Sequence, residues 1–159
     1  MSTTPVPSPL GVLVVGPSPE ETGGMASVVE QTLTLDYGGR YRLELLPFTM
    51  SPGDEGAPDR VGRHVRQFQL LSRRVREMSA SIVHLHTCSG FSFYRSVADM
   101  MLAKRLGCRT VLHVHGAGFD RFYAEAAAIQ RRLIGWALAS ADAVIALSGN
   151  WARELRAMS

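Results

Sequence analysis

The feature that most constrains the fold is an alternation of short β-branched apolar runs with longer segments whose apolar residues recur every three to four positions. The short runs are typical of strands buried in a parallel sheet, and the longer segments are typical of amphipathic helices. From Leu10 onward the alternation predicts an α/β fold built from strand–helix–strand units. Strands are expected over 10–16, 41–48, 82–86, 110–115 and 143–147, and helices over 25–35, 59–78, 93–106, 120–140 and 150–158.

The handedness of strand–helix–strand crossovers limits how such strands can be ordered. The simplest arrangement is a Rossmann-like parallel sheet of order 2-1-3-4-5 with helices on both faces. One domain is expected over residues 10–159, after a flexible Pro- and Ser-rich lead-in over residues 1–9. Open α/β sheets bind ligands at the carboxyl ends of their strands, where the strand order reverses. Here that point lies between the first and third strands, which are followed by residues 16–25 and 87–94.

The loop after the first strand places Gly23 and Gly24 at the start of a helix. Glycines let the backbone approach a ligand closely, and the free N–H groups of a helix N-terminus favour a phosphate. The local sequence fits a phosphate contact and an ordinary turn about equally well. It matches neither G-x-G-x-x-G nor the phosphate-binding loop of NTPases, because the Lys-Ser/Thr pair is absent.

Two His-x-His pairs end the third and fourth strands: His84 with His86, and His113 with His115. Residues two apart share one face of a strand, so each pair projects together. With Cys88 nearby a metal site is conceivable, but no carboxylate lies at a short fixed spacing. Buried histidines with satisfied hydrogen bonds are the favoured interpretation, and no metal is expected. His115 differs because Gly116 follows it, at a strand end where an imidazole can hydrogen-bond a ligand hydroxyl or exchange a proton.

Residues 89–95, after the third strand, carry aromatic side chains and an arginine into the next helix. Phe91, Phe93 and Tyr94 are compatible with ordinary core packing, which for Phe93 is the favoured interpretation. Arg95 is harder to explain structurally, because a cation near a helix N-terminus opposes the helix dipole. A bound anion would resolve that conflict.

The net charge of +3 is unevenly distributed. Six arginines and no acidic residue lie between Arg60 and Arg76, so the rest of the chain carries −3. On the helix expected there, with Asp59 as its N-cap, the buried stripe comprises Val61, Val65, Phe68, Leu71, Val75 and Met78. The opposite side carries Arg63, Arg66, Leu70, Arg73 and Arg74. A solvated polar face is the simpler interpretation, and a membrane-facing helix attracted to anionic lipid is the alternative. Nucleic acid is not an expected partner, because no helix-turn-helix, zinc or RNP pattern accompanies the patch.

Composition excludes several other classes of protein. The longest apolar runs, 10–15 and 143–147, are much shorter than the roughly 18–20 residues that cross a bilayer. Two cysteines, Cys88 and Cys108, are too few for a disulfide framework and favour a reducing, cytoplasmic compartment. The amino terminus has neither the basic nor the apolar region of a secretory signal.

Several segments together resemble a known family. They are Gly23-Gly-Met-Ala-Ser-Val-Val29, Val83-His-Leu-His-Thr87 with Ser92-Phe-Tyr-Arg95, Leu112-His-Val-His-Gly116 with Phe119-Asp-Arg-Phe-Tyr123, and Ala141-Asp-Ala-Val-Ile-Ala-Leu-Ser148. Their order and spacing resemble the amino-terminal half of retaining GT-B glycosyltransferases of the GT4 (group 1) family, over residue 10 to the end of the chain.

The resemblance implies a two-domain transferase that uses a UDP- or GDP-linked sugar and builds a polysaccharide or glycolipid on a sugar or lipid-linked acceptor. It implies that Gly23, Gly24 and Met25 lie against the donor diphosphate and that His115 is catalytic, hydrogen-bonded to a sugar hydroxyl. The acceptor side would comprise Thr87, Phe93, Tyr94, Arg95, Gly116 and Ser148. Neither a metal nor another cofactor is implied.

The family's second, donor-binding domain does not appear in this sequence, so little or no turnover is expected from these residues alone. A second copy of the chain could cover the exposed inter-domain face. A lipid-linked acceptor would bring the protein to the inner face of the membrane. The alternative is a flavodoxin-like or dinucleotide-binding module without glycosyl transfer. Against that alternative, the glycine motif is missing and the second strand ends in Leu46-Pro-Phe48, without an acidic residue.

Overall fold

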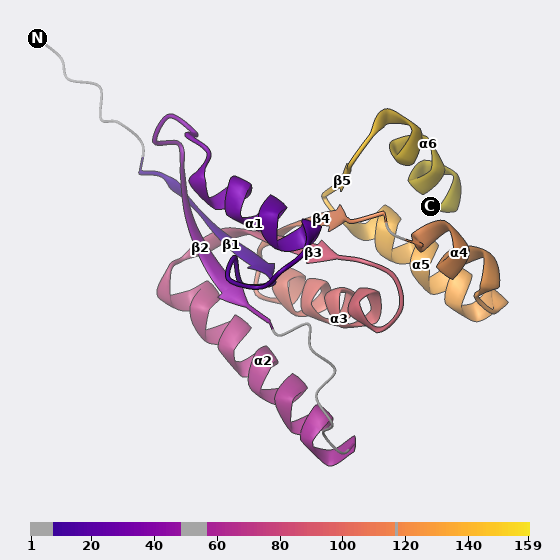
Figure 1. Cartoon of the computed structure of the whole chain (residues 1–159). Helices are drawn as coiled ribbons and strands as arrows, with labels where there is room; N and C mark the ends of the chain where they lie inside the picture. The colour runs from indigo at the N-terminus through magenta and orange to yellow at the C-terminus, as the bar shows by residue number, and fades with distance from the viewer. Residues whose placement is uncertain (1–7, 49–56, 117) are drawn as a thin grey trace, which may run out of the picture.

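The fold was analysed in a computed structural model, which describes residues 8–48, 57–116 and 118–159, with only the backbone of residues 57–61 and 63. Within these residues five parallel strands form one sheet of order β2-β1-β3-β4-β5 (Figure 1). The strands are β1 (Leu10–Gly16), β2 (Tyr41–Pro47), β3 (Ala80–Thr87), β4 (Arg109–Val114) and β5 (Ala143–Ala146). The helices are α1 (Gly24–Thr34), α2 (Ala57–Glu77), α3 (Phe91–Arg105), α4 (Phe119–Glu125), α5 (Ala128–Ser140) and α6 (Gly149–Met158). The predicted α/β class and strand order are confirmed.

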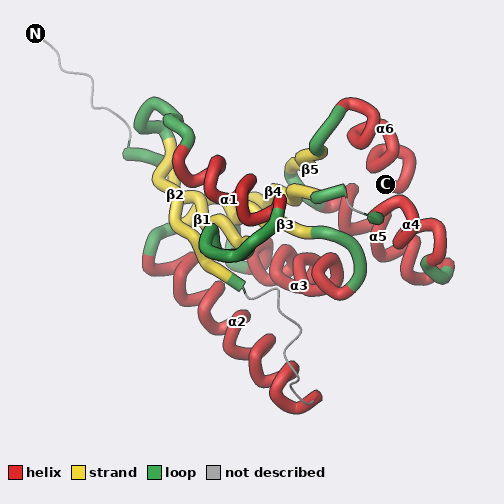
Figure 2. The backbone as a smooth tube through the Cα atoms, in the orientation of Figure 1, coloured by secondary structure: helices red, strands yellow, loops and turns green. Residues whose placement is uncertain are grey.

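The two faces of the sheet are covered by different helices. Figure 2 shows α1 on one face and α2 with α3 on the other. Alternation along β1 explains this division, since Leu13 and Val15 join the larger core on the side of α2 and α3. Val12 and Val14 pack instead with Val29 of α1. The same alternation in β3 and β4 puts all of their histidines on the α1 side of the sheet.

One predicted helix is wrong. The single helix expected over 120–140 is divided into α4 and α5 at Ala126 and Ala127, whose ψ angles of 142° and 157° are extended. Side chains of α5 stabilise the break. The Gln130 side chain accepts a hydrogen bond from the backbone N–H of Ala127 at 2.8 Å, and Arg131 Nε donates to the Ala126 carbonyl at 3.0 Å. The buried Ala126 side chain joins the core, so packing outweighs the strong helix preference of the alanines.

The remaining helix and strand ends agree with the predicted ends to within two residues. The predicted buried stripe of α2 is confirmed at Leu71, Val75 and Met78. The prediction is wrong at Val65, which is 50% exposed. The buried positions all lie toward the C-terminal end of the helix, so Val65 does not pack into the core. The side chains of Asp59 and Val61 lie outside the described residues. No helix in the described ranges is both long and apolar enough to cross a membrane.

Candidate functional site

Three loops leave the sheet side by side at the carboxyl ends of β1, β3 and β4 (Figure 1). The loop after β1 ends at Gly23, which precedes α1 with a φ of +146° that favours glycine. Gly23 and Gly24 are exposed, and a Cβ built on either would have no atom within 4 Å. Met25, the third predicted phosphate contact, is half-buried. The start of α1 is therefore open around these two glycines, as the approach of an anion to a helix N-terminus requires.

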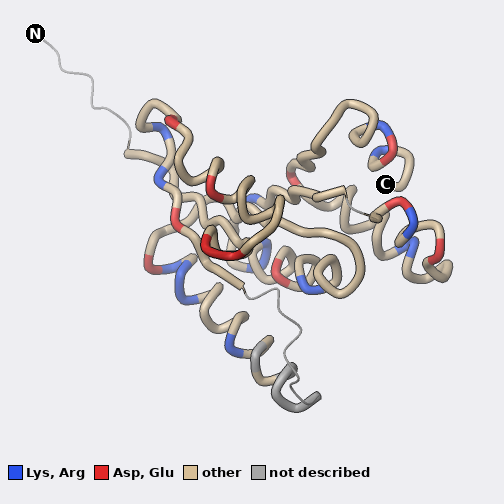
Figure 3. The backbone as a smooth tube through the Cα atoms, in the orientation of Figure 1, with Lys and Arg blue, Asp and Glu red and all other residues tan. Residues whose placement is uncertain are grey.

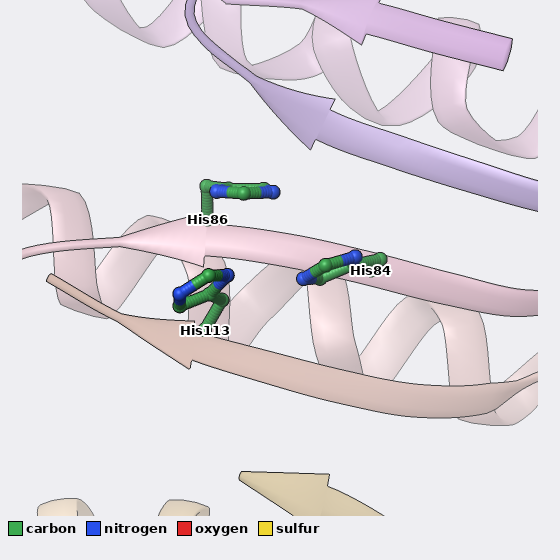
Figure 4. Close-up of side chains that lie close together, drawn as sticks. All are labelled: His84, His86 and His113. Atoms are coloured by element: carbon green, nitrogen blue, oxygen red, sulfur yellow. The ribbon is translucent and has the colours of Figure 1, made fainter. Parts of the chain in front are cut away.

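Four histidines lie together on the face of the sheet that α1 covers: His84 and His86 of β3 and His113 of β4 (Figure 4), and His115, which directly follows β4. The strand register places His86 opposite His113, and His84 and His115 lie two residues away from them on the same face. All four side chains are buried, with exposed fractions between 0% and 9%. Neighbouring rings stack at centroid distances of 4.5–5.5 Å. The Nδ1 atom of His86 lies 3.0 Å from Nε2 of His115, within hydrogen-bonding distance.

Burial determines the charge of this histidine cluster. Burial, with a smaller contribution from the neighbouring imidazoles, lowers the pKa of His84 and of His115 to about 4 and that of His86 to about 2. Burial also lowers the pKa of His113. The rings are therefore neutral at neutral pH, and each offers one N–H donor and one acceptor nitrogen. His115 can hydrogen-bond a hydroxyl, but it carries no positive charge.

The prediction that these histidines are buried with satisfied hydrogen bonds is only partly correct. The rings are buried as expected. However, three ring nitrogens find no hydrogen-bond partner in the described part of the chain: Nε2 of His84, Nε2 of His86 and Nδ1 of His113. Such nitrogens are rare in a protein interior, because an unpartnered buried polar atom is costly.

A second group of polar atoms without partners surrounds the first turn of α3. The Arg95 guanidinium carbon lies 3.4 Å from the centre of the Phe48 ring, a cation–π contact. Its Nε and Nη2 atoms are buried and have no hydrogen-bond acceptor among the described residues, as is also true of the hydroxyls of Ser92 and Tyr94. Burial lowers the pKa of Arg95, and the nearby Asp99 opposes that shift. Donors without partners at this position are what an anionic or hydroxyl-bearing ligand would satisfy.

Asp99 lies one helical turn after Arg95 and completes this group. Both of its carboxylate oxygens are buried without a hydrogen-bond donor from the described residues. Burial raises its pKa to about 6, although the positive charge of Arg95 opposes the shift. The pair is therefore a buried arginine beside a carboxyl group that gives up its proton only near neutral pH.

The other predicted acceptor residues differ in their access to a ligand. Thr87 and Phe93 have no exposed surface, so neither side chain can line an acceptor surface in this structure. The Phe93 ring packs edge-on against the Phe119 ring, with ring centres 5.2 Å apart. This contact packs the first turn of α3 against the start of α4. Gly116 faces the Trp151 ring, which would lie 3.3 Å from a Cβ at that position. Ser148 is exposed, and its hydroxyl caps α6 by accepting a hydrogen bond from the Trp151 backbone N–H at 3.2 Å.

The predicted membrane-facing residues belong to α2, along which Figure 3 shows basic positions in blue. Arg66, Arg73 and Arg74 are exposed, and Leu70 is 37% exposed among them. The side chain of Arg63 lies outside the described residues. Glu77, the first acidic residue after the arginine run, pairs with Arg73 at 3.4 Å and with Arg74 at 3.5 Å. This acid partly neutralises the basic face, which sequence counting had treated as free of negative charge.

A hollow of about 440 Å³ lies on the same side of the molecule, between α2 and α3. Its lining includes Phe68, Arg73, Arg76 and Leu102. These residues belong to the C-terminal ends of the two helices, which precede the starts of β3 and β4. The hollow is therefore distant from the carboxyl ends of the strands, where the histidines lie, and takes no part in that site.

Sequence reasoning missed Asp99, Phe48 and Trp151. Asp99 follows Arg95 by four residues on one helix, a spacing that brings side chains together, so the signal was present. Phe48 and Trp151 reach the site from distant parts of the chain, and no local pattern marks them.

A comparison with family models decides the classification. The model of the glycosyl transferase 4-like domain matches residues 12–159. The chain belongs to this family. Searches of curated proteins and of solved structures found no match. The family match confirms the predicted resemblance, and the sheet order gives this glycosyl transferase 4-like domain the Rossmann-like fold expected of a GT-B domain.

Proposed function

We propose that this glycosyl transferase 4-like domain forms the acceptor side of a retaining glycosyltransferase that uses a UDP- or GDP-linked sugar as donor. The family match over residues 12–159 carries the proposal. It is supported by the positions of Gly23, Arg95 and His115, which lie in the segments that follow the neighbouring strands β1, β3 and β4 at one end of the sheet. The product is a polysaccharide or a glycolipid.

In the proposed reaction the bond between the anomeric carbon and the donor diphosphate breaks. A new bond forms from an acceptor hydroxyl oxygen to the same face of the sugar. The hydroxyl proton passes to a phosphate oxygen of the leaving UDP or GDP, which departs with the remaining negative charge. The exposed N-terminus of α1 at Gly23 and Gly24 stabilises that charge through its backbone N–H groups and helix dipole. This stabilisation needs no rearrangement of side chains, because no atom lies within 4 Å of the Cβ position at either glycine.

His115 acts in this proposal as a neutral hydrogen-bonding group for a sugar hydroxyl. Its lowered pKa, about 4, argues against a cationic acid at neutral pH. The contact between its Nε2 atom and Nδ1 of His86 holds the ring in one orientation. The backbone N–H of His115 donates to the Thr87 carbonyl at 2.7 Å and fixes the loop against β3. His86 and Thr87 are thus positioning residues for His115.

The acceptor binds beside the first turn of α3 in this proposal. Arg95 and Tyr94 supply donors that have no partner within the described residues, and these donors suit a phosphate or a group of hydroxyls. Gly116 and Ser148 border the same end of the sheet from β4 and β5. A lipid-linked acceptor would also explain the basic face of α2, where Val65 and Leu70 are exposed near arginines and could contact an anionic membrane.

Binding of UDP and GDP, followed by NMR titration of the chain, tests the donor side. Gly24→Ala is expected to weaken nucleotide binding about tenfold, because the new methyl group occupies the space through which a diphosphate approaches the backbone. Gly149→Ala is the matched control, since Gly149 also begins a helix and also has open space around its Cβ position. Equal binding by both variants would contradict the diphosphate site.

The same titration with NAD and FMN tests the alternative function. A glycosyl transferase 4-like domain is expected to bind neither of them more tightly than UDP or GDP. Tight binding of NAD or FMN would instead support a dinucleotide-binding or flavodoxin-like module and would overturn the proposal.

A further inference from the structure

The guanidinium group of Arg95 has one whole edge without a hydrogen-bond acceptor. Its Nε and Nη2 atoms, which together form the side-on edge of the group, are buried and have no partner among the described residues. The face of the group is occupied, because its central carbon lies 3.4 Å from the centre of the Phe48 ring. The Phe48 ring contacts the guanidinium plane but provides no oxygen for its edge.

Arg131 of α5 shows how such an edge is filled elsewhere in the chain. Its guanidinium carbon also lies over an aromatic ring, 5.8 Å from the centre of the Tyr123 ring. Its Nε atom donates to the Ala126 carbonyl at 3.0 Å, and its Nη2 atom donates to the Ala124 carbonyl at 2.5 Å. The same two atoms of Arg95 have no such oxygens. Two parallel N–H donors on one guanidinium edge match two oxygens of a phosphate or a carboxylate.

Asp99 does not fill the edge of Arg95. An arginine and an aspartate four residues apart on a helix can form an ion pair. The positive charge of Arg95 opposes the rise in the pKa of Asp99, so the two groups lie near each other. However, Asp99 is only 1% exposed, and neither of its carboxylate oxygens has a hydrogen-bond donor from the described residues. The edge of Arg95 is therefore left for an anion from outside the chain.

The start of α3 adds a further donor on the same side of the helix. Ser92 lies three residues before Arg95, a spacing that places both side chains on one helix face. The Ser92 hydroxyl is also buried and finds no partner in the described part of the chain. The first turn of α3 contains no acidic side chain, and no side chain caps it at Gly90. The helix dipole at this end favours a negative charge.

A ligand can reach this edge from the surface. Arg95, Ser92 and the neighbouring Cys88 are each half-buried and not fully enclosed. The free donor atoms themselves are covered, so a bound anion must rotate the flexible Arg95 side chain or displace the side chains over it. Hydrogen bonds from a guanidinium to an anion are stronger than bonds between neutral groups, and they offset a weakened contact with the Phe48 ring.

We propose that the Nε–Nη2 edge of Arg95, together with the Ser92 hydroxyl, binds an oxyanion group of the acceptor, either a phosphate or a carboxylate. Assignment of this group to the acceptor rests on the proposed function, whereas the oxyanion site itself does not. The site is separate from Gly23 and Gly24 at the start of α1, where the donor diphosphate is proposed to bind. A neutral sugar would leave the charge of Arg95 without a partner and is not the expected ligand.

NMR titrations of the chain with glucose 6-phosphate, glucuronate and glucose, at constant ionic strength, test the proposal. At least one of the two charged sugars is expected to shift the amide resonances of residues 90–96, and glucose at the same concentration should not. A response to glucose 6-phosphate assigns a phosphate to the acceptor, and a response to glucuronate assigns a carboxylate.

Variants test which atoms bind the charged sugar. Arg95→Lys is expected to weaken binding at least about fivefold, because lysine keeps the charge but lacks the two-donor edge. Ser92→Ala should weaken it about threefold through loss of one hydrogen bond. Asp99→Asn should strengthen it at least about twofold at pH 8, because a nearby negative charge is removed. Arg131→Lys is the matched control and should bind like wild type, because backbone carbonyls already fill its edge.

The wild-type titrations decide the test even if a variant fails to fold, which circular dichroism detects. Glucose binding as tightly as the charged sugars, or no shift of residues 90–96 with either charged sugar, would overturn the inference. Equal binding by Arg95→Lys and wild type, or unchanged binding by Asp99→Asn, would overturn it as well. A chain that binds UDP or GDP but neither charged sugar overturns only this inference. Binding of a charged sugar at residues 90–96 without binding of UDP or GDP would contradict the proposed function and keep the oxyanion site.

Discussion

At the scale of single residues, Asp99 gives the clearest pH dependence. Its pKa of about 6 lies above the value of 3.8 expected in the unfolded chain. The folded state therefore binds a proton that the unfolded state releases, and Asp99 contributes most to stability below pH 3.8. That contribution is lost as the pH rises through 6. Asp99→Asn removes this titration, so wild type should lose about 1 kcal/mol relative to the variant between pH 5 and pH 8.

Urea unfolding of both proteins at the two pH values measures this difference. The sheet histidines titrate equally in wild type and Asp99→Asn, so their contribution cancels when the two free energies of unfolding are compared. A difference between the proteins that does not change with pH would mean that Asp99 ionises at its ordinary pKa. In that case the Arg95 charge would compensate fully for the burial of the carboxyl group.

Single residues also show why part of the site escaped prediction. Arg95 was recognised as a candidate because a cation near a helix N-terminus opposes the helix dipole. His115 was recognised because it lies at the end of a strand. The missing partners of His84, His86 and His113 depend on how β3 is aligned with β4, which no local pattern records. Phe93 and Thr87 were placed on the acceptor side by resemblance, yet their burial depends on α4 and on the sheet beneath them.

At the scale of elements, Gly135 controls the approach of α6 to α5. A Cβ at Gly135 would lie 2.6 Å from the backbone carbonyl oxygen of Met158, a distance too short to be tolerated. Gly135→Ala is expected to push the end of α6 away and lower the free energy of unfolding by about 1–3 kcal/mol. The better helix preference of alanine offsets about 1 kcal/mol of that loss.

Amide hydrogen exchange measures the effect on α6 directly. Exchange should become faster in α6 of Gly135→Ala, while β1, β3 and β4 keep their wild-type protection. Gly149→Ala is the control on the same pair of helices, because its Cβ position has no neighbour within 4 Å. If amide exchange in α6 is unchanged in Gly135→Ala, then α5 and α6 accommodate the added methyl group without loss of stability in α6.

The elements themselves were largely predictable, because hydrophobic period and strand handedness are properties of the sequence. Five strands, their order and most helix ends follow from these two rules. The break between α4 and α5 does not, since the alanines around it favour a helix and the extended backbone at Ala126 is held by Gln130 and Arg131. Capping by side chains that come later in the chain leaves no signal at the break itself.

At the scale of the whole molecule, the basic face of α2 and the candidate functional site lie in different places. The histidines, Arg95 and the start of α1 are associated with the carboxyl ends of the strands, whereas the arginines of α2 extend along a helix on one face (Figure 3). Opposite ends of α2 also differ in environment, since its C-terminal half packs into the core and Val65 does not. A membrane contact through α2 would therefore leave the proposed donor site accessible from solution.

Flotation with vesicles containing anionic lipid tests that contact. The chain is expected to bind at low salt and to dissociate as salt rises, because exposed charges are screened beyond about 10 Å at 0.1 M.

Each of Arg66→Gln and Arg73→Gln should weaken binding about fivefold, since an arginine near an anionic surface contributes about 1 kcal/mol. Glu77→Gln should strengthen binding, because it releases Arg73 and Arg74 from their ion pairs. Arg121→Gln, on α4 and paired with Glu125, is the control for loss of any surface arginine. If all four variants bind the vesicles to the same extent, the arginine side of α2 is a solvated polar face. In that case α2 does not bring the protein to a membrane-bound acceptor.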